Sequence, residues 1–399
     1  MTDATPTETR SPVPQAQPAR RDLLDLLKRL DAHEGALATL ILDVHSENDP
    51  NAPAQRADAA LRELSLERDV RERLERQVHE RLRSAGEGVL VLYLDPDREE
   101  PVGERLLRVA PPLPGGASQA AAWWGPPVTS PVQLLLASRS PLVAAFVDER
   151  RARLFVVDLG EAVEAAAYVR ALDTEGWRRF GEHSTGMPGR PARGGAGMDD
   201  FEARKDVWTA RFVSELAERL QIAIGTDPNA RLALIGETRR TKQLEEALSA
   251  PARERILMRA PAPADPDLPT PKWAGPLTDL VSGARRDEDR TLLDRLEQEG
   301  VSGPGPTLEA LQEGRLRTLV APVEDDLEIV RCLDAGWIAP DEASARAVCP
   351  DGPIERAWLR DRLYPLLQAG RTELRLLRGE TGREATRRFG PVAGLPRRG

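Results

Sequence analysis

The sequence predicts a mixed α/β protein made of three small α/β domains, and three observations lead to this prediction. The chain has 399 residues, which is too long for one ordinary core because domains typically hold about 100–200 residues. Short apolar runs typical of buried strands alternate with amphipathic helical stretches. Segments rich in proline and glycine, such as "APAPADPDLPTP" at 260–271, separate these groups of elements.

The predicted first domain, 21–137, follows a leader at 1–20 that we expect to be disordered because it is polar and rich in proline. A leucine-rich helix at 21–30 precedes an apolar strand at 35–44. Five apolar residues four apart then predict one long helix: Leu66, Val70, Leu74, Val78 and Leu82. Strands are expected at 89–95 and 105–110, and the domain ends near the turn-rich "PPLPGGASQ" and "WWGPPVTSP".

The predicted central domain, 138–262, opens with two apolar runs around the polar "DERRAR", which indicates a β-hairpin within 140–161. After a glycine-rich loop, a helix is expected from the four-residue spacing of Trp208, Phe212, Leu216 and Leu220. Asp199 and Asp200 would place negative charge at its start. A strand at 230–237, a helix at 239–248 and a strand at 255–260 complete the domain.

The predicted third domain spans 272–399. It begins with a helical run at 277–300, and "TLEALQEGRLRTLVAP" (307–322) then predicts a helix that ends at Gly314 and a strand. A helix at 353–369, a strand at 372–379 and the closing "GPVAGLPRR" follow.

Composition excludes several classes of protein. The net charge of −9 rules out a protein that binds polyanions through a bulk positive field, so contacts with nucleic acid would be local. Two cysteines exclude a disulfide framework and suit a reducing compartment. No apolar run approaches the roughly 18 residues that a membrane span needs, and the first 20 residues lack a signal-peptide core. We therefore expect a cytoplasmic protein with no membrane partner.

Motifs for catalysis are scarce. The sequence contains no GxxxxGK[ST], no GxGxxG after a strand, no HExxH and no GxSxG. Its four histidines are scattered, and isolated histidines are more often surface residues than ligands or bases. The sequence therefore predicts no catalytic residue and no cofactor.

Cys332 and Cys349 lie in "RCLDAGWIAPDEASARAVCPDGPIE", which has the outline of two zinc knuckles. A tetrahedral zinc site would need a second thiolate three residues after each cysteine. Those positions hold Ala335 and Gly352, so we predict no metal. The alternative interpretation is two unrelated cysteines in a loop.

The stretch "RRFGEHSTGMPGRPARGGAGMDDFEARKD" (178–206) contains the Gly-Gly pair. Glycine backbone can approach an RNA terminus or a phosphate closely because it has no Cβ and reaches positive φ. Four arginines in it would add local positive charge for phosphate contacts: Arg178, Arg179, Arg190 and Arg193. The alternative is a loop that is merely flexible, as many loops of this composition are.

Three segments resemble the bacterial branch of the archaeo-eukaryotic release factors, relatives of Pelota and of Balon-type ribosome hibernation factors. "DERRARLFVVDLGE" (148–161) resembles the hairpin that opens the family's central domain. "RGGAGMDDFEARKD" (193–206) stands where release factors carry a GGQ loop. "TLEALQEGRLRTLVAP" with "FGPVAGLPRR" is similar to the third domain, whose fold is akin to kink-turn-binding ribosomal proteins. The two cysteines match the place of a zinc minidomain in some members, here without its full ligand set.

The resemblance implies a three-domain, release-factor-like arrangement and a defined role for the loop. In release factors the GGQ loop enters the peptidyl transferase centre and helps water to attack the peptidyl-tRNA ester. Gly194 and Gly195 match the two glycines, and Ala196 takes the place of the glutamine. Alanine keeps a backbone N–H but has no side-chain donor or acceptor with which to position water. The first domain carries no NIKS-like tetrapeptide, so stop-codon decoding is not expected.

The resemblance therefore implies a ribosome-binding translation factor that occupies the A site, with the Gly-Gly loop toward the peptidyl transferase centre. Its RNA-binding residues would be the four loop arginines with Gly194, Gly195 and Ala196. The partners would be ribosomal RNA and a translational GTPase, with no DNA, and the role would be hibernation or stalled-ribosome handling. Two alternatives stay open: a peptidyl-tRNA hydrolase for ribosome rescue, which is the one enzymatic role considered, and a non-ribosomal interaction protein of the same fold.

Overall fold

The structure is a computed structural model of the chain. It describes residues 18–45, 49, 51–116, 119–148, 151–169, 196–225, 230–262 and 270–397. These residues form two compact units, each described by itself below. Unit 1 holds Pro141–Val157 and Glu161–Val281, and unit 2 holds Pro18–Ser140, Asp158–Gly160 and Ser282–Gly399.

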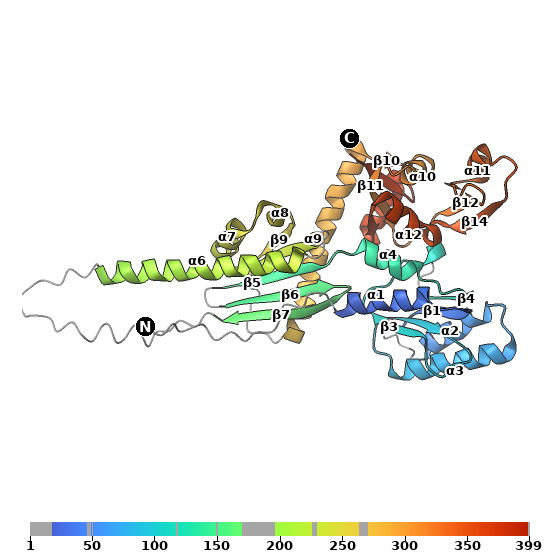
Figure 1. The fold of residues 1–399 in the computed structure, drawn as a ribbon, viewed down its shortest axis with the longest axis horizontal. Coiled ribbons are helices and arrows are strands. Elements are labelled where there is room, and N and C mark those ends of the chain that lie inside the picture. Colours follow the sequence, from blue (N-terminus) through green and yellow to red (C-terminus); the bar gives the residue numbers. More distant parts are fainter. Residues whose placement is uncertain are drawn as a thin grey trace, which may run out of the picture. The chain divides into compact units, whose positions relative to one another are not determined.

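Unit 1 is built on a five-stranded sheet of order β7-β6-β5-β8-β9 (Figure 1). Its strands are β5 (Leu142–Val147), β6 (Arg151–Asp158), β7 (Glu161–Val169), β8 (Arg231–Gly236) and β9 (Ile256–Ala260). β5 pairs antiparallel with β6 and parallel with β8, and β9 pairs parallel with β8. Every residue of β5 is buried, because apolar side chains cover both faces of a central strand.

Helices cover the two faces of this sheet. One face packs against α6 (Ala196–Gly225), α7 (Thr238–Ala247) and α8 (Ala250–Arg253). The other face packs against Trp273, Leu277 and Val281 near the start of α9 (Thr270–Glu299). Unit 1 is therefore a three-layer α/β/α sandwich.

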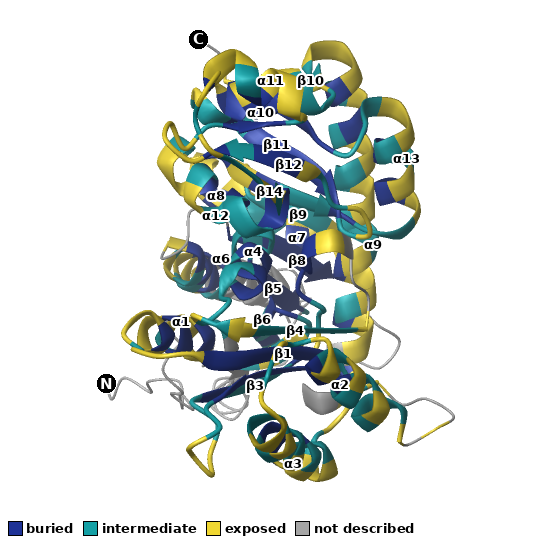
Figure 2. Cartoon of the chain, turned by 90° about the vertical axis from the view of Figure 1, so that its right-hand side faces the viewer, coloured by how far each residue is buried: buried dark blue, intermediate teal, exposed yellow. Residues whose placement is uncertain are grey.

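Unit 2 contains a second sandwich, formed by residues 18–140. Its sheet has the order β3-β2-β1-β4 with antiparallel pairing throughout. The strands are β1 (Leu37–Asp43), β2 (Val89–Leu94), β3 (Gly103–Leu107) and β4 (Ala120–Gly125). α1 (Pro18–Asp31) and α4 (Ser130–Ser138) pack on one face, and α2 (Ala52–Arg62) and α3 (Arg68–Ser84) pack on the other. Figure 2 shows β1 buried and the outer sides of α2 and α3 exposed.

A third sandwich, also in unit 2, has the strand order β10-β16-β11-β15. Its strands are β10 (Val301–Ser302), β11 (Leu316–Pro322), β15 (Glu373–Leu377) and β16 (Ala393–Pro396). α10 (Pro304–Gln312) and α12 (Leu359–Gly370) cover one face, and the end of α9 with α13 (Gly379–Phe389) covers the other. Gly314 follows α10 with φ 67°, a left-handed conformation that glycine adopts without strain.

A small subdomain is inserted between β11 and α12. Its sheet has the order β13-β12-β14, with β12 (Glu328–Cys332), β13 (Ile338–Ala339) and β14 (Ile354–Trp358), and it carries α11 (Glu342–Val348). Its own cluster of fully buried apolar residues contains Val330, Ala339 and Ala345. Cys332 and Cys349 are joined in a disulfide, with Cα atoms 6.1 Å apart. The interpretation of two unrelated cysteines is therefore wrong, and the bond holds a subdomain whose core is very small.

Arg360 ties the two sandwiches of unit 2 together. From α12 it donates to the carbonyl oxygens of Leu113 (2.6 Å), Pro322 (2.7 Å) and Val323 (2.8 Å). The Asp326 carboxylate lies 3.9 Å from its Nε and accepts the Gly115 N–H at 3.0 Å. Both ionic side chains are almost fully buried. The guanidinium of Arg360 therefore holds the segment before β4 and the segment after β11 in place.

The predicted fold class is confirmed: the chain is a mixed α/β protein with several small sheets. Two local predictions are wrong. The stretch "WWGPP" was expected to be turn-rich, but Trp123 and Trp124 lie in β4. The helix expected at 353–369 begins only at Leu359, because 354–358 pairs as β14 with β12. The three-domain boundaries at 21–137, 138–262 and 272–399 stay a prediction.

We predict that Arg360→Met lowers the free energy of unfolding of unit 2 by about 3–5 kcal/mol, because it leaves buried carbonyls and the Asp326 carboxylate without their cation. Chemical denaturation of the purified protein measures this loss. The matched control is Arg356→Met, since Arg356 is exposed and pairs with Glu328 at 3.6 Å. It should cost less than about 1 kcal/mol, and equal losses in both variants would contradict the role of Arg360.

We also predict that the double variant Cys332→Ser, Cys349→Ser loosens the inserted subdomain. A crosslink with a sequence separation of 17 contributes about 3 kcal/mol in the chain-entropy model. Hydrogen exchange followed by mass spectrometry should show faster exchange at 328–358 and unchanged exchange in β11. Unchanged exchange at 328–358 would show that the disulfide is dispensable.

Candidate functional site

The candidate site is the glycine-rich loop between β7 and α6. Arg178, Arg179, Arg190, Arg193, Gly194 and Gly195, all predicted RNA-binding residues, lie outside the described residues. Ala196, also predicted there, is the first residue of α6. The described chain therefore leaves the sheet at Val169 in β7 and returns at the N-terminal end of a long helix.

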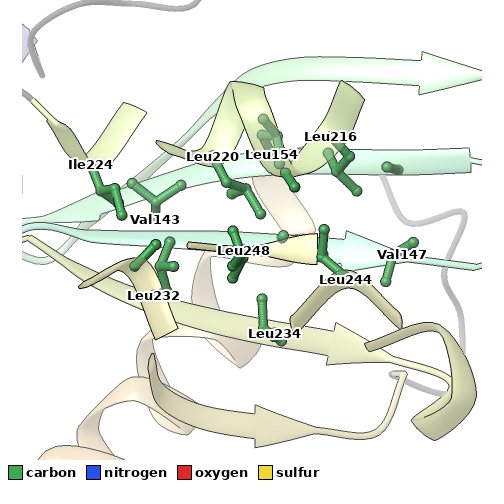
Figure 3. Packing of buried hydrophobic residues seen from close by; sticks show 14 of the residues in the cluster. Val143, Val147, Leu154, Leu216, Leu220, Ile224, Leu232, Leu234, Leu244 and Leu248 are labelled. Carbon is green, nitrogen blue, oxygen red and sulfur yellow. The ribbon is translucent and has the colours of Figure 1, made fainter. Parts of the chain in front are cut away.

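The C-terminal half of α6 anchors this helix to the sheet. Leu216, Leu220 and Ile224 are buried in the same apolar cluster as residues of β5, β6 and β8. Figure 3 shows these three side chains among Val143, Leu154 and Leu232. The spacing of four residues places them on one face of the helix. The predicted helical stripe is thus confirmed at Leu216 and Leu220, while the side chain of Trp208 lies outside the described residues.

The length of α6 carries its first residue away from this anchor. The helix has 30 residues and is about 45 Å long at 1.5 Å per residue. Figure 1 shows its N-terminal part extending past the strands of the sheet. A helix anchored at one end can therefore present the loop at its other end.

An aromatic cluster on the face of the sheet opposite α6 stiffens the strands that precede the loop in the sequence. Phe155 of β6 stacks on Trp273 of α9 at 5.1 Å between ring centroids, and Phe146 of β5 lies 5.3 Å from the same ring. Arg153 lies over the rings of Phe155 and Trp273 and pairs with Glu164 of β7 at 2.7 Å. These contacts hold β6 and β7, and hence the entry to the loop, in a fixed place on the sheet.

At Ala196, the first residue of α6, the chemistry available is that of a backbone donor, and the carboxylates of Asp199 and Asp200 follow within the next four residues of the sequence. The first four N–H groups of an α-helix have no partner within the helix and carry partial positive charge. Ala196 contributes one of these groups and no polar side chain. The position can therefore donate a hydrogen bond to an anionic or carbonyl oxygen, but it holds no side-chain group that could act as an acid or a base.

The part of the chain that the structure describes offers no cluster of side chains for a metal ion. Within it, no three His, Cys, Asp or Glu side chains lie close enough together to hold a metal ion. Among the described helices, none is both long and apolar enough to cross a bilayer.

Two further arginines make contacts between residues far apart in the sequence. Arg20 of α1 forms an ion pair with the buried Asp158 at 2.8 Å, and Arg285 of α9 donates to the Ser140 carbonyl at 2.6 Å. The paired residues are more than 130 positions apart, so no local pattern could have shown that they meet.

Residues 127–272 match the family model "Bacterial archaeo-eukaryotic release factor family 10". The chain resembles these release factors. The matched segment runs from just before α4 to the start of α9 and contains the whole of the Gly-Gly loop. The resemblance inferred from the sequence is therefore confirmed. No curated protein sequence matches the chain.

Several solved structures are similar over most of the chain at low identity. The archaeal translation termination factor aRF1 is 12% identical, with 95% of this chain and 98% of that chain covered and a TM-score of 0.24. Pelota from Thermoplasma acidophilum is 12% identical, with 94% and 93% covered and a TM-score of 0.24. A ribosome-bound archaeal Pelota with ABCE1 is 12% identical, with 96% and 98% covered and a TM-score of 0.38. At these TM-scores the solved structures add no support to the function proposed below.

We predict that Leu220→Ala lowers the free energy of unfolding of unit 1 by about 2–5 kcal/mol, because it opens a cavity under α6. Ile222→Ala on the same helix is the matched control, since Ile222 is 58% exposed and its truncation should change stability by less than about 0.5 kcal/mol. Thermal and denaturant unfolding measure both. Similar losses would contradict the assignment of the buried face of α6.

Proposed function

We propose that the protein is a ribosome-binding translation factor. It occupies the A site with the Gly-Gly loop toward the peptidyl transferase centre, and it acts in hibernation or in the handling of stalled ribosomes. The observation that carries this proposal is the family match over 127–272, because that segment contains the Gly-Gly loop together with the sheet and helix that flank it. The first part of the chain would face the decoding centre, without reading a stop codon.

The geometry of unit 1 supports this proposal through the described residues on either side of the loop, Val169 of β7 and Ala196 of α6. The buried face of α6 fixes one end of the helix, and Gly194 and Gly195 directly precede the other end. Two residues without Cβ atoms allow RNA to approach the backbone closely. Arg190 and Arg193 lie just before the two glycines in the sequence, and their positive charge would attract the phosphates of RNA.

Ala196 favours occupancy of the site over catalysis. Its position corresponds to the glutamine of the release-factor loop, and alanine offers only a backbone N–H there. We therefore propose that the bound protein blocks the site without hydrolysing peptidyl-tRNA. A translational GTPase delivers it, and it works in the cytoplasm.

Ribosome cosedimentation tests the proposal. We expect the full chain to sediment with ribosomes, and the double variant Arg190→Ala, Arg193→Ala to bind at least tenfold more weakly, because phosphate contacts dominate such affinities. The charge-matched control is Arg68→Ala, Arg290→Ala, since both arginines are exposed and, among the described residues, pair with neighbours on their own helices, Glu72 and Asp287. It should bind as the unmodified protein does.

Two results would contradict the proposal. If the full chain fails to sediment with ribosomes at low salt, the remaining alternative is a non-ribosomal interaction protein of the same fold. Alternatively, ribosomes loaded with peptidyl-tRNA could release peptide in a manner that depends on Gly195, which would identify a peptidyl-tRNA hydrolase. If peptide release is the same with and without the protein, the result supports a protein that occupies the A site without hydrolysing peptidyl-tRNA.

A further inference from the structure

The inserted subdomain at 328–358 carries more negative than positive charge. Its basic residues are Arg331, Arg346 and Arg356, and its acidic residues are Glu328, Asp334, Asp341, Glu342, Asp351 and Glu355. The net charge of this short segment is therefore −3. An acidic surface attracts cationic partners and repels polyanions.

Four of the six carboxylates already have a partner in the described part of the chain. The pairs are Glu328 with Arg356, Glu342 with Arg346, Glu355 with Arg362, and Asp341 with the Ser344 N–H. Arg346 also donates to the Gly352 carbonyl at 2.8 Å, so its guanidinium is engaged. Asp334 and Asp351 are exposed, and among the described residues neither carboxylate forms an ion pair or a hydrogen bond.

Both of these carboxylates lie at one end of the subdomain, next to the disulfide. We call this end the subdomain tip, and its members are Leu333, Asp334, Ala335, Val348, Pro350, Asp351 and Pro353. The Leu333 N–H donates to the Pro353 carbonyl at 3.0 Å. A Cβ atom added to Gly352 would collide with the Cys349 sulfur and with the Asp334 carboxylate. The two stretches that form the tip are therefore in direct contact.

The apolar side chains of the subdomain tip are exposed. Leu333 is 42% exposed and Val348 is 49% exposed. Ala335, Pro350 and Pro353 are exposed as well. Exposed apolar surface bordered by charged groups is typical of sites that bind other proteins, because its removal from water favours association.

We propose that the subdomain tip binds a protein segment in which basic side chains flank an apolar one. The apolar side chain packs on Leu333 and Val348, and the basic side chains donate to Asp334 and Asp351. RNA is unsuited to the tip, because two unpaired carboxylates would face its phosphates. This binding surface lies in unit 2 and is independent of the Gly-Gly loop and of the ribosomal function proposed above.

The charge part is tested by calorimetric titration of the full chain with a synthetic peptide of alternating lysine and leucine. We expect saturable binding, and about tenfold weaker binding by the double variant Asp334→Asn, Asp351→Asn, because both charged acceptors are lost. The charge-matched control is Asp31→Asn, Asp294→Asn, since these two residues are also exposed and lie outside the subdomain. It should bind as the unmodified chain does.

The apolar part is tested with Leu333→Ser, which should weaken binding of the same peptide severalfold, because less apolar surface is covered. Ile222→Ser is the matched control, since Ile222 is 58% exposed and lies on α6. A peptide of alternating lysine and serine should bind more weakly than the lysine and leucine peptide. Circular dichroism checks that each variant is folded.

Three results would overturn the proposal. The first is absence of saturable binding, and the second is equal affinity in the Asp334, Asp351 double variant and its control. The third is equal affinity for the two lysine peptides, which would show that charge alone is recognised. A single-stranded RNA that displaces the peptide would contradict the choice of a protein partner. No ribosome is present, so failure here is separate from failure of the proposed function.

Discussion

The packing of one half of α6 against the central sheet is the constraint on which the candidate site depends. Leu216, Leu220 and Ile224 bury one helical face among strands that are themselves covered on both sides. The described side chains of α6 that make this contact belong to its C-terminal half, and the helix has 30 residues, so its first residue, Ala196, begins about 45 Å from its last. The apolar core thus fixes the helix at which the segment of glycines and arginines ends.

Unit 2 depends on a different kind of contact, in which arginines donate to backbone carbonyls. Arg360 holds the segments that follow β3 and β11, Arg20 binds the Asp158 carboxylate, and Arg285 binds the Ser140 carbonyl. A guanidinium can bind several carbonyls at once, since it has five N–H donors. Arginine side chains thus stabilise the interior of this acidic protein by hydrogen bonds to backbone carbonyls.

Much of the fold could be predicted from the sequence, because apolar spacing is a local signal. The period of four in α3 and α6 and the apolar runs of β2, β5 and β8 identify those elements directly. β4 was missed because "AAAWWG" has weak strand propensity at its alanines and lies beside prolines, and its state is imposed by pairing with β1. β14 was missed for the same reason, since it is a strand only through its pairing with β12.

The candidate site was predictable only in part. The Gly-Gly pair and the residue that follows it are visible in the sequence, whereas the disulfide and the ion pair of Arg20 with Asp158 arise from tertiary contacts. The central claim is that this loop reaches the peptidyl transferase centre, and a cryo-EM map of ribosomes incubated with the full chain tests it most directly. The account predicts density in the A site, with residues 178–206 next to the peptidyl transferase centre. Density elsewhere on the ribosome, or an A site left empty at saturating protein, would contradict it.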